Sequence, residues 1–280
     1  MRRELLCCCM LLWLWLAGPA AAATPHAAIT LDRVGDAVVV IDQQATRLNL
    51  LDYLPVGSQL RLSAGARVSL VFLNSSTEWV FVGPGRYRLS AESPSTLEGA
   101  SPTKGGAAAP PSDTERRFDP ARRERMILGA SVTRSGALLR IVGPDLVEVL
   151  GNPPTLVWKS ARRQKVRVAV LQAATMASVA QAEVDGERWT LPAPLPPGDY
   201  VWHIGEGSDG VVRGPVARFK VVDAAGARYR SLLRRPQSFA QRLALALELE
   251  AEGLSHDALL MLSTLAAERP DEPALDPWRH

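Results

Sequence analysis

Residues 54–89 read LPVGSQLRLSAGARVSLVFLNSSTEWVFVGPGRYRL, and this stretch decides the fold of the N-terminal third of the chain. Two apolar runs, Val68–Leu73 and Trp79–Val82, are separated by the polar residues Asn74–Ser76. Short apolar runs bounded by Asn, Ser, Gly and Pro are typical of β-strands that are joined by tight turns. We therefore expect an all-β domain over residues 28–91.

The same stretch resembles the periplasmic FecR-type domain. The resemblance rests on a G-x-x-L entry at Gly57–Leu60, a small-residue turn at Ala64–Gly65, the strand pair, and a closing turn at Gly83–Gly85. Where that family usually has Asp-Gly-Ser in the hairpin, this chain has Asn74–Ser76, which keeps the turn chemistry. The resemblance implies an exported envelope domain. In FecR-type regulators such a domain passes a signal to a cytoplasmic segment on the N-terminal side of a membrane span.

The N-terminus predicts export. Residues 1–23 combine a short basic start, an unbroken apolar run from Leu5 to Leu16 and a series of small residues before Thr24. This order is typical of a secretory signal peptide cleaved near the Ala23–Thr24 bond, which implies a periplasmic protein of a bacterium. The alternative is a retained membrane anchor of about 20 residues, with only a few residues before it. The sequence leaves open whether export follows the general or the twin-arginine route.

Composition excludes several classes of protein. The three cysteines, Cys7, Cys8 and Cys9, all lie in the segment that we expect to be removed. The mature chain would then contain no disulfide or thiolate, so apolar cores must stabilise it. The formal net charge of the whole chain is only +3, which is too small to favour a nucleic-acid partner.

The middle of the chain predicts a connection between domains. Residues 92–114 are rich in Ser, Pro, Gly and Ala, cannot bury an apolar face and predict a flexible linker. Residues 115–135 follow as a basic connecting segment, with arginines at positions 116, 117, 122, 123 and 125.

Residues 136–223 predict a second β domain. Runs such as Val166–Val170 alternate with period two, and proline-rich segments separate the runs. The runs that end at Trp158 and Trp202 resemble strands of an immunoglobulin-like or fibronectin-III-like sandwich. This resemblance implies that the two tryptophans are core residues from facing sheets.

Residues 231–270 change to a helical period. The pattern predicts one helix that ends at Gly253 and a second that Ser255 caps and Pro270 stops, followed by a tail over residues 271–280. The spacing resembles a single tetratricopeptide repeat. Because such units need neighbours to bury their faces, we expect the pair to pack on the sandwich, on another copy or on a partner. The side chains expected to bind a partner are Phe239, Leu243, Leu247, Leu259 and Leu262.

No catalytic, cofactor-binding or metal-binding residues are predicted. The four histidines, His26, His203, His256 and His280, are isolated, and the zinc-site and serine-nucleophile motifs are missing. Gly205–Gly210 spells a dinucleotide fingerprint, but a strand pattern instead of a helix follows it, so it predicts a hairpin turn. A pair of distant carboxylates, as in glycosidases, is the arrangement that the sequence leaves open.

These patterns together predict a non-enzymatic scaffold of the cell envelope that binds a protein partner through its β modules and helical pair. The alternatives are a FecR-type signalling regulator and a protein that binds carbohydrate or cell-wall polymer. Basic clusters at Arg116–Arg125, Arg162–Arg167 and Arg228–Arg235 suit an anionic polymer or lipid headgroup, or else form solvated faces.

Overall fold

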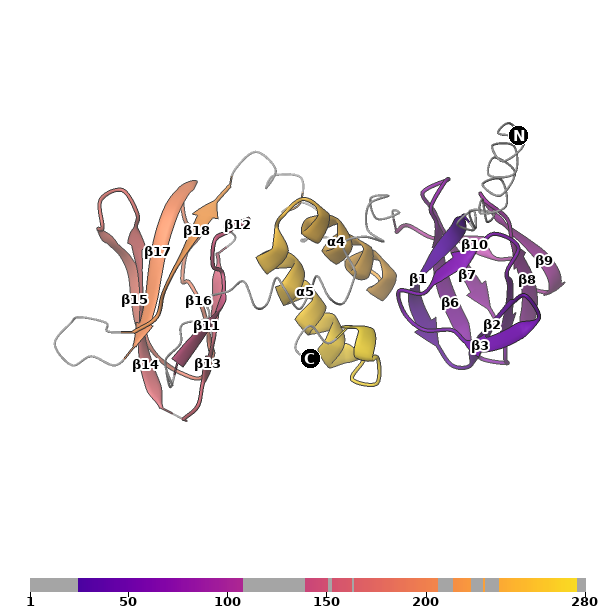
Figure 1. Cartoon of the computed structure of the whole chain (residues 1–280), viewed down its shortest axis with the longest axis horizontal. Helices are drawn as coiled ribbons and strands as arrows, with labels where there is room; N and C mark the ends of the chain where they lie inside the picture. Colours follow the sequence, from indigo (N-terminus) through magenta and orange to yellow (C-terminus); the bar gives the residue numbers. More distant parts are fainter. Residues whose placement is uncertain are drawn as a thin grey trace, which may run out of the picture.

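The computed structural model describes residues 25–107, 139–150, 153–162, 164–205, 214–222, 229 and 237–275. The described part is mainly β, with two β domains and a pair of helices that lies between them (Figure 1). The predicted fold class is therefore confirmed. The expected signal peptide at 1–23 and the basic segment at 115–135 lie outside the described residues. No helix among the described residues is long and apolar enough to cross a membrane.

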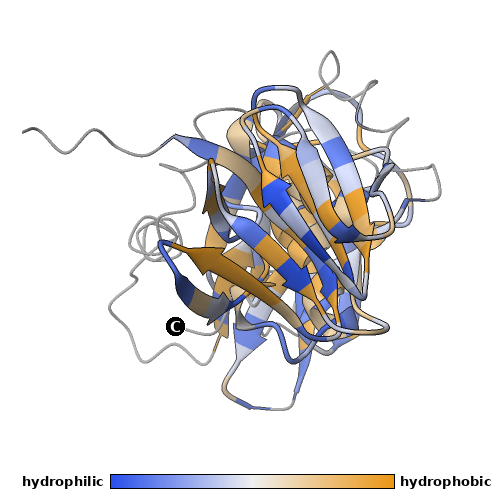
Figure 2. Ribbon diagram, turned by 90° about the vertical axis from the view of Figure 1, so that its right-hand side faces the viewer, coloured by the Kyte–Doolittle hydropathy of each residue, from blue (hydrophilic) through white to orange (hydrophobic). Residues whose placement is uncertain are grey.

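The N-terminal domain consists of two five-stranded sheets, with orders β10-β7-β6-β1-β4 and β3-β2-β5-β8-β9. Apolar residues at alternate positions of each strand face the other sheet, so that Leu60, Leu70, Phe81 and Tyr87 share one core. Figure 2 shows this alternation of apolar and polar residues along the strands. The strands are β1 (His26–Val34), β2 (Ala37–Ile41), β3 (Gln44–Arg47), β4 (Tyr53–Pro55), β5 (Gln59–Leu62), β6 (Arg67–Phe72), β7 (Thr77–Val82), β8 (Gly85–Leu89), β9 (Pro94–Gly99) and β10 (Thr103–Lys104).

The expectation of a flexible linker from residue 92 onward is wrong up to residue 107. Strand β9 pairs with β8, and β10 pairs with β7. Gly99 has a φ of +93° and lies against the backbone of Pro84, where a Cβ atom would come within 2.5 Å of the carbonyl oxygen. Small and polar residues here satisfy backbone hydrogen bonds of the sheets, a role that composition alone does not reveal. The rest of the expected linker, 108–114, lies outside the described residues.

Glu78 fixes the end of this added segment. Its side chain is 4% exposed, accepts a hydrogen bond from the Ser69 hydroxyl, and accepts another from the Ala107 backbone N–H at 2.6 Å. The backbone carbonyl of Glu78 also accepts from the Gly105 N–H at 3.0 Å. The carboxylate and the backbone carbonyl of Glu78 together hold residues 105–107 on β7.

We expect Glu78→Ala to speed tryptic cleavage after Lys104 about tenfold or more, because loss of a hydrogen bond to a charged group costs about 1.5–3 kcal/mol of local stability. Time-resolved limited proteolysis with mass spectrometry measures the rate. The matched control is Glu98→Ala, which removes the same charge from an exposed ion pair with Arg86. Equal cleavage rates in the two variants would contradict the anchoring role of Glu78.

The second β domain is a sandwich of a three-stranded sheet, β11-β13-β16, and a five-stranded sheet, β12-β18-β17-β14-β15. Trp158 of β13 and Trp202 of β17 are both fully buried in the core between the sheets, as predicted. The Trp202 indole N–H donates to the Pro144 carbonyl at 2.7 Å. The strands are β11 (Leu139–Gly143), β12 (Val147–Val149), β13 (Thr155–Ser160), β14 (Lys165–Gln172), β15 (Ser178–Asp185), β16 (Arg188–Thr190), β17 (Gly198–Gly205) and β18 (Val216–Val221).

The helical pair consists of α4 (Phe239–Ala251) and α5 (Ser255–Glu268). Ser238 and Gln241 form a reciprocal capping box at the start of α4. Gly253 takes a φ of +84° after α4, the conformation that ends many helices. The expected cap of α5 at Ser255 is wrong, because Leu254 is the cap residue and no side chain caps the helix.

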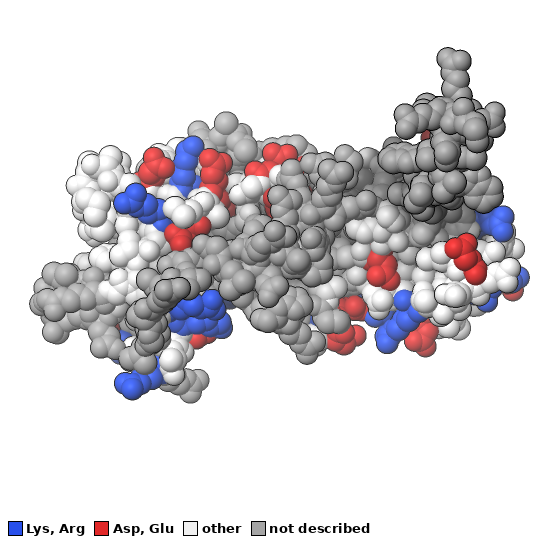
Figure 3. Space-filling view, in the orientation of Figure 1, with Lys and Arg blue, Asp and Glu red and all other residues white. Residues whose placement is uncertain are grey.

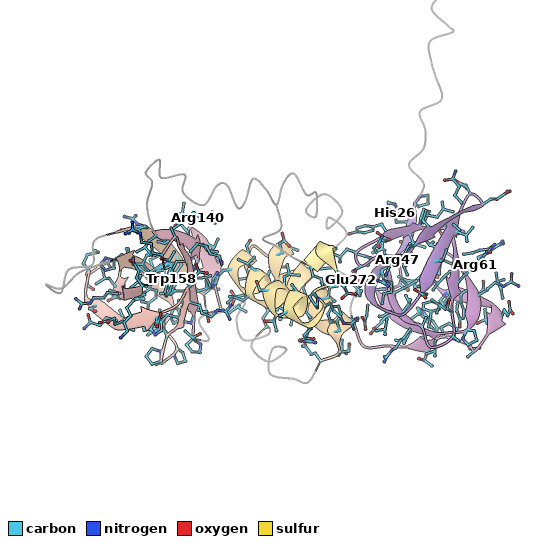
Figure 4. All side chains as sticks on the ribbon, turned by 90° about the horizontal axis from the view of Figure 1, so that it is seen from below. His26, Arg47, Arg61, Arg140, Trp158 and Glu272 are labelled. Carbon is cyan, nitrogen blue, oxygen red and sulfur yellow. The ribbon has the colours of Figure 1, made fainter. Side chains whose placement is uncertain are left out.

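The expected tail is also wrong in its first half. Glu272 and Leu275 are 5% and 1% exposed, and a short 3-10 helix, η1 (Pro273–Leu275), follows α5. Figure 4 shows Glu272 at the junction between the helices and the N-terminal domain. The chain after α5 therefore forms part of that junction. Residues 276–280 lie outside the described residues.

Candidate functional site

The structure changes the expected role of the helical pair, because the chain itself covers most of its apolar faces. Phe239, Leu243 and Leu247 of α4 are 8%, 0% and 0% exposed, and Leu262 of α5 is 4% exposed. These four residues share a buried cluster with side chains of the N-terminal domain, among them Ile29, Leu31, Leu50 and Val71. Four of the five residues expected to bind a partner are therefore internal contacts, and Leu259 alone of the five is half-exposed.

Charged groups complete the junction with the N-terminal domain. Arg33 of β1 forms a buried ion pair with Glu272. Arg269, which follows α5, donates to the Asp32 carboxylate at 3.1 Å and to the Arg33 carbonyl at 3.0 Å, and lies 4.7 Å from the centre of the Phe239 ring. Burial raises the pKa of Asp32, and the Arg269 charge opposes that shift. The contacts join β1 to the last described residues of the chain.

The junction with the sandwich centres on the start of α5. His256 is 4% exposed, and its Nε2 lies 2.7 Å from the Thr155 carbonyl of β13. The Asp257 carboxylate accepts from the Leu150 backbone N–H at 3.2 Å. Burial lowers the pKa of His256 to about 4 and raises that of Asp257 to about 6. At neutral pH His256 is therefore a neutral imidazole that donates to the Thr155 carbonyl.

A cleft of about 810 Å³ opens beyond this junction, between α5 and the outer face of the three-stranded sheet. Leu156 and Trp158 of β13 point into the sandwich core, so Val157 and Lys159 face the opposite way, toward the cleft. The half-exposed Leu259 and Leu260 form the wall that α5 contributes. The lining residues are Val157–Ser160, Arg162, Gln164, Asp185–Arg188, Leu259, Leu260 and Ser263.

The rim of the cleft is charged, and some of its charged side chains are held by ion pairs and hydrogen bonds. Lys159 forms an ion pair with Glu187 at 2.8 Å, and the Ser160 backbone N–H donates to the other Glu187 oxygen at 3.0 Å. The hydrogen bond from Lys159, followed by that from Ser160, holds the pKa of Glu187 below its usual value. Arg162, Arg188 and Asp185 have no ion-pair partner within the described residues. The cleft thus offers an apolar wall beside unpaired charges of both signs.

The two serine hydroxyls that line the cleft are already hydrogen-bonded to the backbone. The Ser160 hydroxyl donates to the Arg162 carbonyl at 2.5 Å and the Ser263 hydroxyl to the Leu259 carbonyl at 2.8 Å, so backbone groups occupy both hydroxyl protons. No histidine or cysteine is among the described residues that line the cleft. No group of three or more metal-ligating side chains occurs elsewhere in the described part of the chain.

The other candidate sites from the sequence lie away from the cleft or outside the described residues, apart from the basic cluster that begins at Arg162. The glycine-rich stretch Gly205–Gly210 starts where β17 ends, and β17 pairs antiparallel with β18, as the expected hairpin requires. Residues 206–213 lie outside the described residues. Of the basic cluster at Arg162–Arg167, Lys165 pairs with Glu183, and Figure 3 shows Lys, Arg, Asp and Glu intermixed on this face of the sandwich. The arginines of the other two basic clusters, at Arg116–Arg125 and Arg228–Arg235, lie outside the described residues.

Sequence reasoning missed the cleft as a unit. Its residues come from β13, from the turn between β15 and β16, and from α5, and the α5 residues lie more than seventy positions after the other two groups in the chain. The one local sign of the cleft in the sequence is Leu260. The predicted apolar face of the helix includes Leu259 but not Leu260, so Leu260 is an apolar residue that the packing of one helix face does not explain.

Comparisons with protein families, with curated proteins and with solved structures find no match to this chain.

Proposed function

We propose that this protein is a non-enzymatic scaffold of the bacterial cell envelope that binds a polypeptide segment of a partner in the cleft between α5 and the three-stranded sheet. The observation that carries the proposal is the placement of the helical pair. Both β domains hold the helices through buried apolar clusters. The helical pair therefore connects the two β domains and forms one wall of a cleft. Its most apolar face is buried within the chain.

The lining of the cleft indicates the kind of partner. An apolar wall of Leu259, Leu260 and Val157 favours a segment with exposed apolar side chains. The unpaired Arg162, Arg188 and Asp185 favour flanking charges of both signs, which give specificity and orientation. A polypeptide segment supplies both features, whereas a uniformly anionic polymer would meet the carboxylate of Asp185.

The envelope location is part of the same proposal. It rests on the order of basic, apolar and small residues over 1–23 and on the absence of cysteine after Cys9. The FecR-type resemblance over 28–91 supports it, and a mainly β domain at these positions is compatible with that resemblance.

Recovery of partners from envelope extracts tests the proposal. We expect the double substitution Leu259→Asp/Leu260→Asp to reduce recovery of a specific protein at least tenfold, because burying a leucine side chain on binding contributes about 1.5–3 kcal/mol. Truncation before α4 is a poorer test, since it would expose Ile29, Leu31 and Val71, which are at most 1% exposed in the intact chain.

The matched control is Leu97→Asp/Val82→Asp, which places the same charges at exposed apolar positions of the N-terminal domain. Recovery unchanged by the cleft substitutions, or lost equally in the control, would contradict the proposed binding site. Recovery of cell-wall polymer instead of protein would favour the polymer-binding alternative.

A further inference from the structure

One strand of the sandwich, β15 (Ser178–Asp185), is a long sheet edge that is open to another strand. The order of the five-stranded sheet is β12-β18-β17-β14-β15, so β15 pairs with β14 alone. It contains eight residues, whereas the other seven edge strands of the described sheets contain two to six. Proteins usually keep exposed edges short or place lysine or proline on them, because an open edge pairs readily with another chain. β15 contains neither residue.

The hydrogen bonds of β14 show which backbone groups of β15 are free. The Gln172 N–H donates to the Ala177 carbonyl, on the β15 side, and the Ala173 N–H donates to the Asp199 carbonyl, on the β17 side. The N–H and C=O groups of successive strand residues point to opposite sides. The even-numbered residues of β14 therefore bond to β15, where their partners are Ala180, Ala182 and Val184.

The residues between these partners, Gln181 and Glu183, point their backbone groups away from β14. No strand among the described residues pairs with this side of β15. Both side chains are exposed on the outer face of the sheet, and the Glu183 carboxylate has an exposed contact of 3.9 Å with the Lys165 ammonium group. The three residues that bond to β14 are half-exposed on the inner face, toward the core. The edge thus presents free backbone donors and acceptors between a polar face and an apolar face.

The sequence of this edge is complementary to itself. Two copies of β15 that pair antiparallel about a two-fold axis at Ala182 put Gln181 of each copy opposite Glu183 of the other. The free backbone groups of these residues then bond to each other, and the Gln181 amide faces a carboxylate that accepts its hydrogen bond. On the inner face Ala182 meets Ala182 and Ala180 meets Val184, so half-exposed apolar side chains cover one another.

The neighbouring registers lack this match. A shift in one direction sets Glu183 opposite Glu183, and like charges directly opposite destabilise a sheet. A shift in the other direction sets Glu183 opposite Val179. Val179 is also the extra residue at which the register between β14 and β15 changes, so the edge is irregular there. The regular, charge-compatible part of the edge is therefore centred on Ala182.

We propose that two copies of this chain associate by antiparallel pairing of their β15 strands, with Ala182 on the two-fold axis. This goes beyond the proposed function, since it concerns a second copy of the chain and the free edge of a strand, of which only Asp185 lines the cleft. Figure 1 shows β15 on the side of the sandwich that faces away from the helices and the N-terminal domain. The dimer would carry two clefts.

Disulfide trapping tests the proposal with the chain from Thr24 to His280, which contains no cysteine. Ala182→Cys sets two thiols opposite each other in a non-hydrogen-bonded pair, with Cα atoms about 4.5 Å apart, a distance that a disulfide spans. We expect mild oxidation to give a cross-linked dimer. The matched control, Ala180→Cys on the same face, separates the thiols by about 13 Å along the strands and should cross-link at least tenfold more slowly.

Equal cross-linking by the two cysteine variants, or none by Ala182→Cys, would overturn the proposal. A wild-type chain that stays monomeric in sedimentation equilibrium at every accessible concentration would also overturn it. Circular dichroism of each variant establishes that the variant is folded.

Substitutions of Gln181 test the register without a cysteine. Gln181→Glu sets two pairs of carboxylates opposite each other and should weaken self-association about tenfold, whereas Gln181→Lys faces Glu183 with a cation and should strengthen it. Sedimentation equilibrium measures both changes. Gln44→Glu, which adds the same charge at an exposed position of β3, is the control. Equal effects of Gln181→Glu and Gln181→Lys, or of Gln181→Glu and the control, would contradict the pairing of Gln181 with Glu183.

Discussion

Arg33→Met will lower the free energy of unfolding by about 3–5 kcal/mol, the cost of leaving one member of a buried ion pair without its partner. Arg33 and Glu272 are 7% and 5% exposed and are separated by 239 positions in the chain. Without the guanidinium, the Glu272 carboxylate stays buried against β1 or pulls the end of the chain away from the N-terminal domain. Denaturation by urea, followed by circular dichroism, measures the loss.

Two comparisons make this prediction specific. Arg86→Met breaks an ion pair whose members are 53% and 64% exposed, and exposed pairs contribute about 0–1 kcal/mol. The double substitution Arg33→Met/Glu272→Leu replaces the buried pair by apolar groups and should recover most of the loss. If Arg33→Met costs no more than Arg86→Met, the C-terminal residues do not dock on β1 in solution.

The junction with the sandwich predicts two opposite dependences of stability on pH. Burial raises the pKa of Asp257 from 3.8 to about 6. The folded state then binds this proton more tightly than the unfolded chain, so its contribution to stability falls as the pH rises from about 4 to 6. Burial lowers the pKa of His256 from 6.5 to about 4. Its contribution falls in the other direction, as the pH drops from about 6.5 to 4.

Single substitutions separate these contributions, which nearly cancel in the wild type. The free energy of unfolding of His256→Gln, relative to wild type, should fall by about 3 kcal/mol from pH 4 to pH 7, because only the contribution of Asp257 then changes with pH. The free energy of unfolding of Asp257→Asn, relative to wild type, should rise by about 3 kcal/mol over the same range, because only the contribution of His256 then changes with pH. Urea denaturation across this pH range gives both profiles. Asp271→Asn, at an exposed position beyond α5, is the control. Parallel profiles for all variants would show that the start of α5 is not buried on the sandwich.

The elements of this fold follow from local pattern, whereas its assembly does not. Period-two alternation predicted the strands that carry Trp158 and Trp202, and the helical period predicted α4 and α5. The same amphipathic face of α4 that predicted a helix gave no information on what covers it. Whether Leu243 packs on a partner or on Ile29 depends on contacts across more than two hundred positions.

Other features that the sequence did not predict also depend on contacts between segments that are distant in the chain. Strands β9 and β10 form through backbone hydrogen bonds to β8 and β7, which small and polar residues can make without any apolar pattern. The free edge of β15 arises because β17 and β18 add to the other side of β14, an order that the sequence of Ser178–Asp185 does not specify. The cleft likewise needs α5 to lie against β13.

The most direct test of the proposed function is site-specific photocrosslinking in living cells, with a photoreactive amino acid at Leu260 in the cleft and, in a separate strain, at Leu97 on the N-terminal domain. The proposal predicts that Leu260 forms a covalent adduct with one envelope protein and that Leu97, which is 50% exposed and remote from the cleft, does not. An adduct from Leu97 alone, or none from Leu260, would contradict the assignment of the cleft as the partner site.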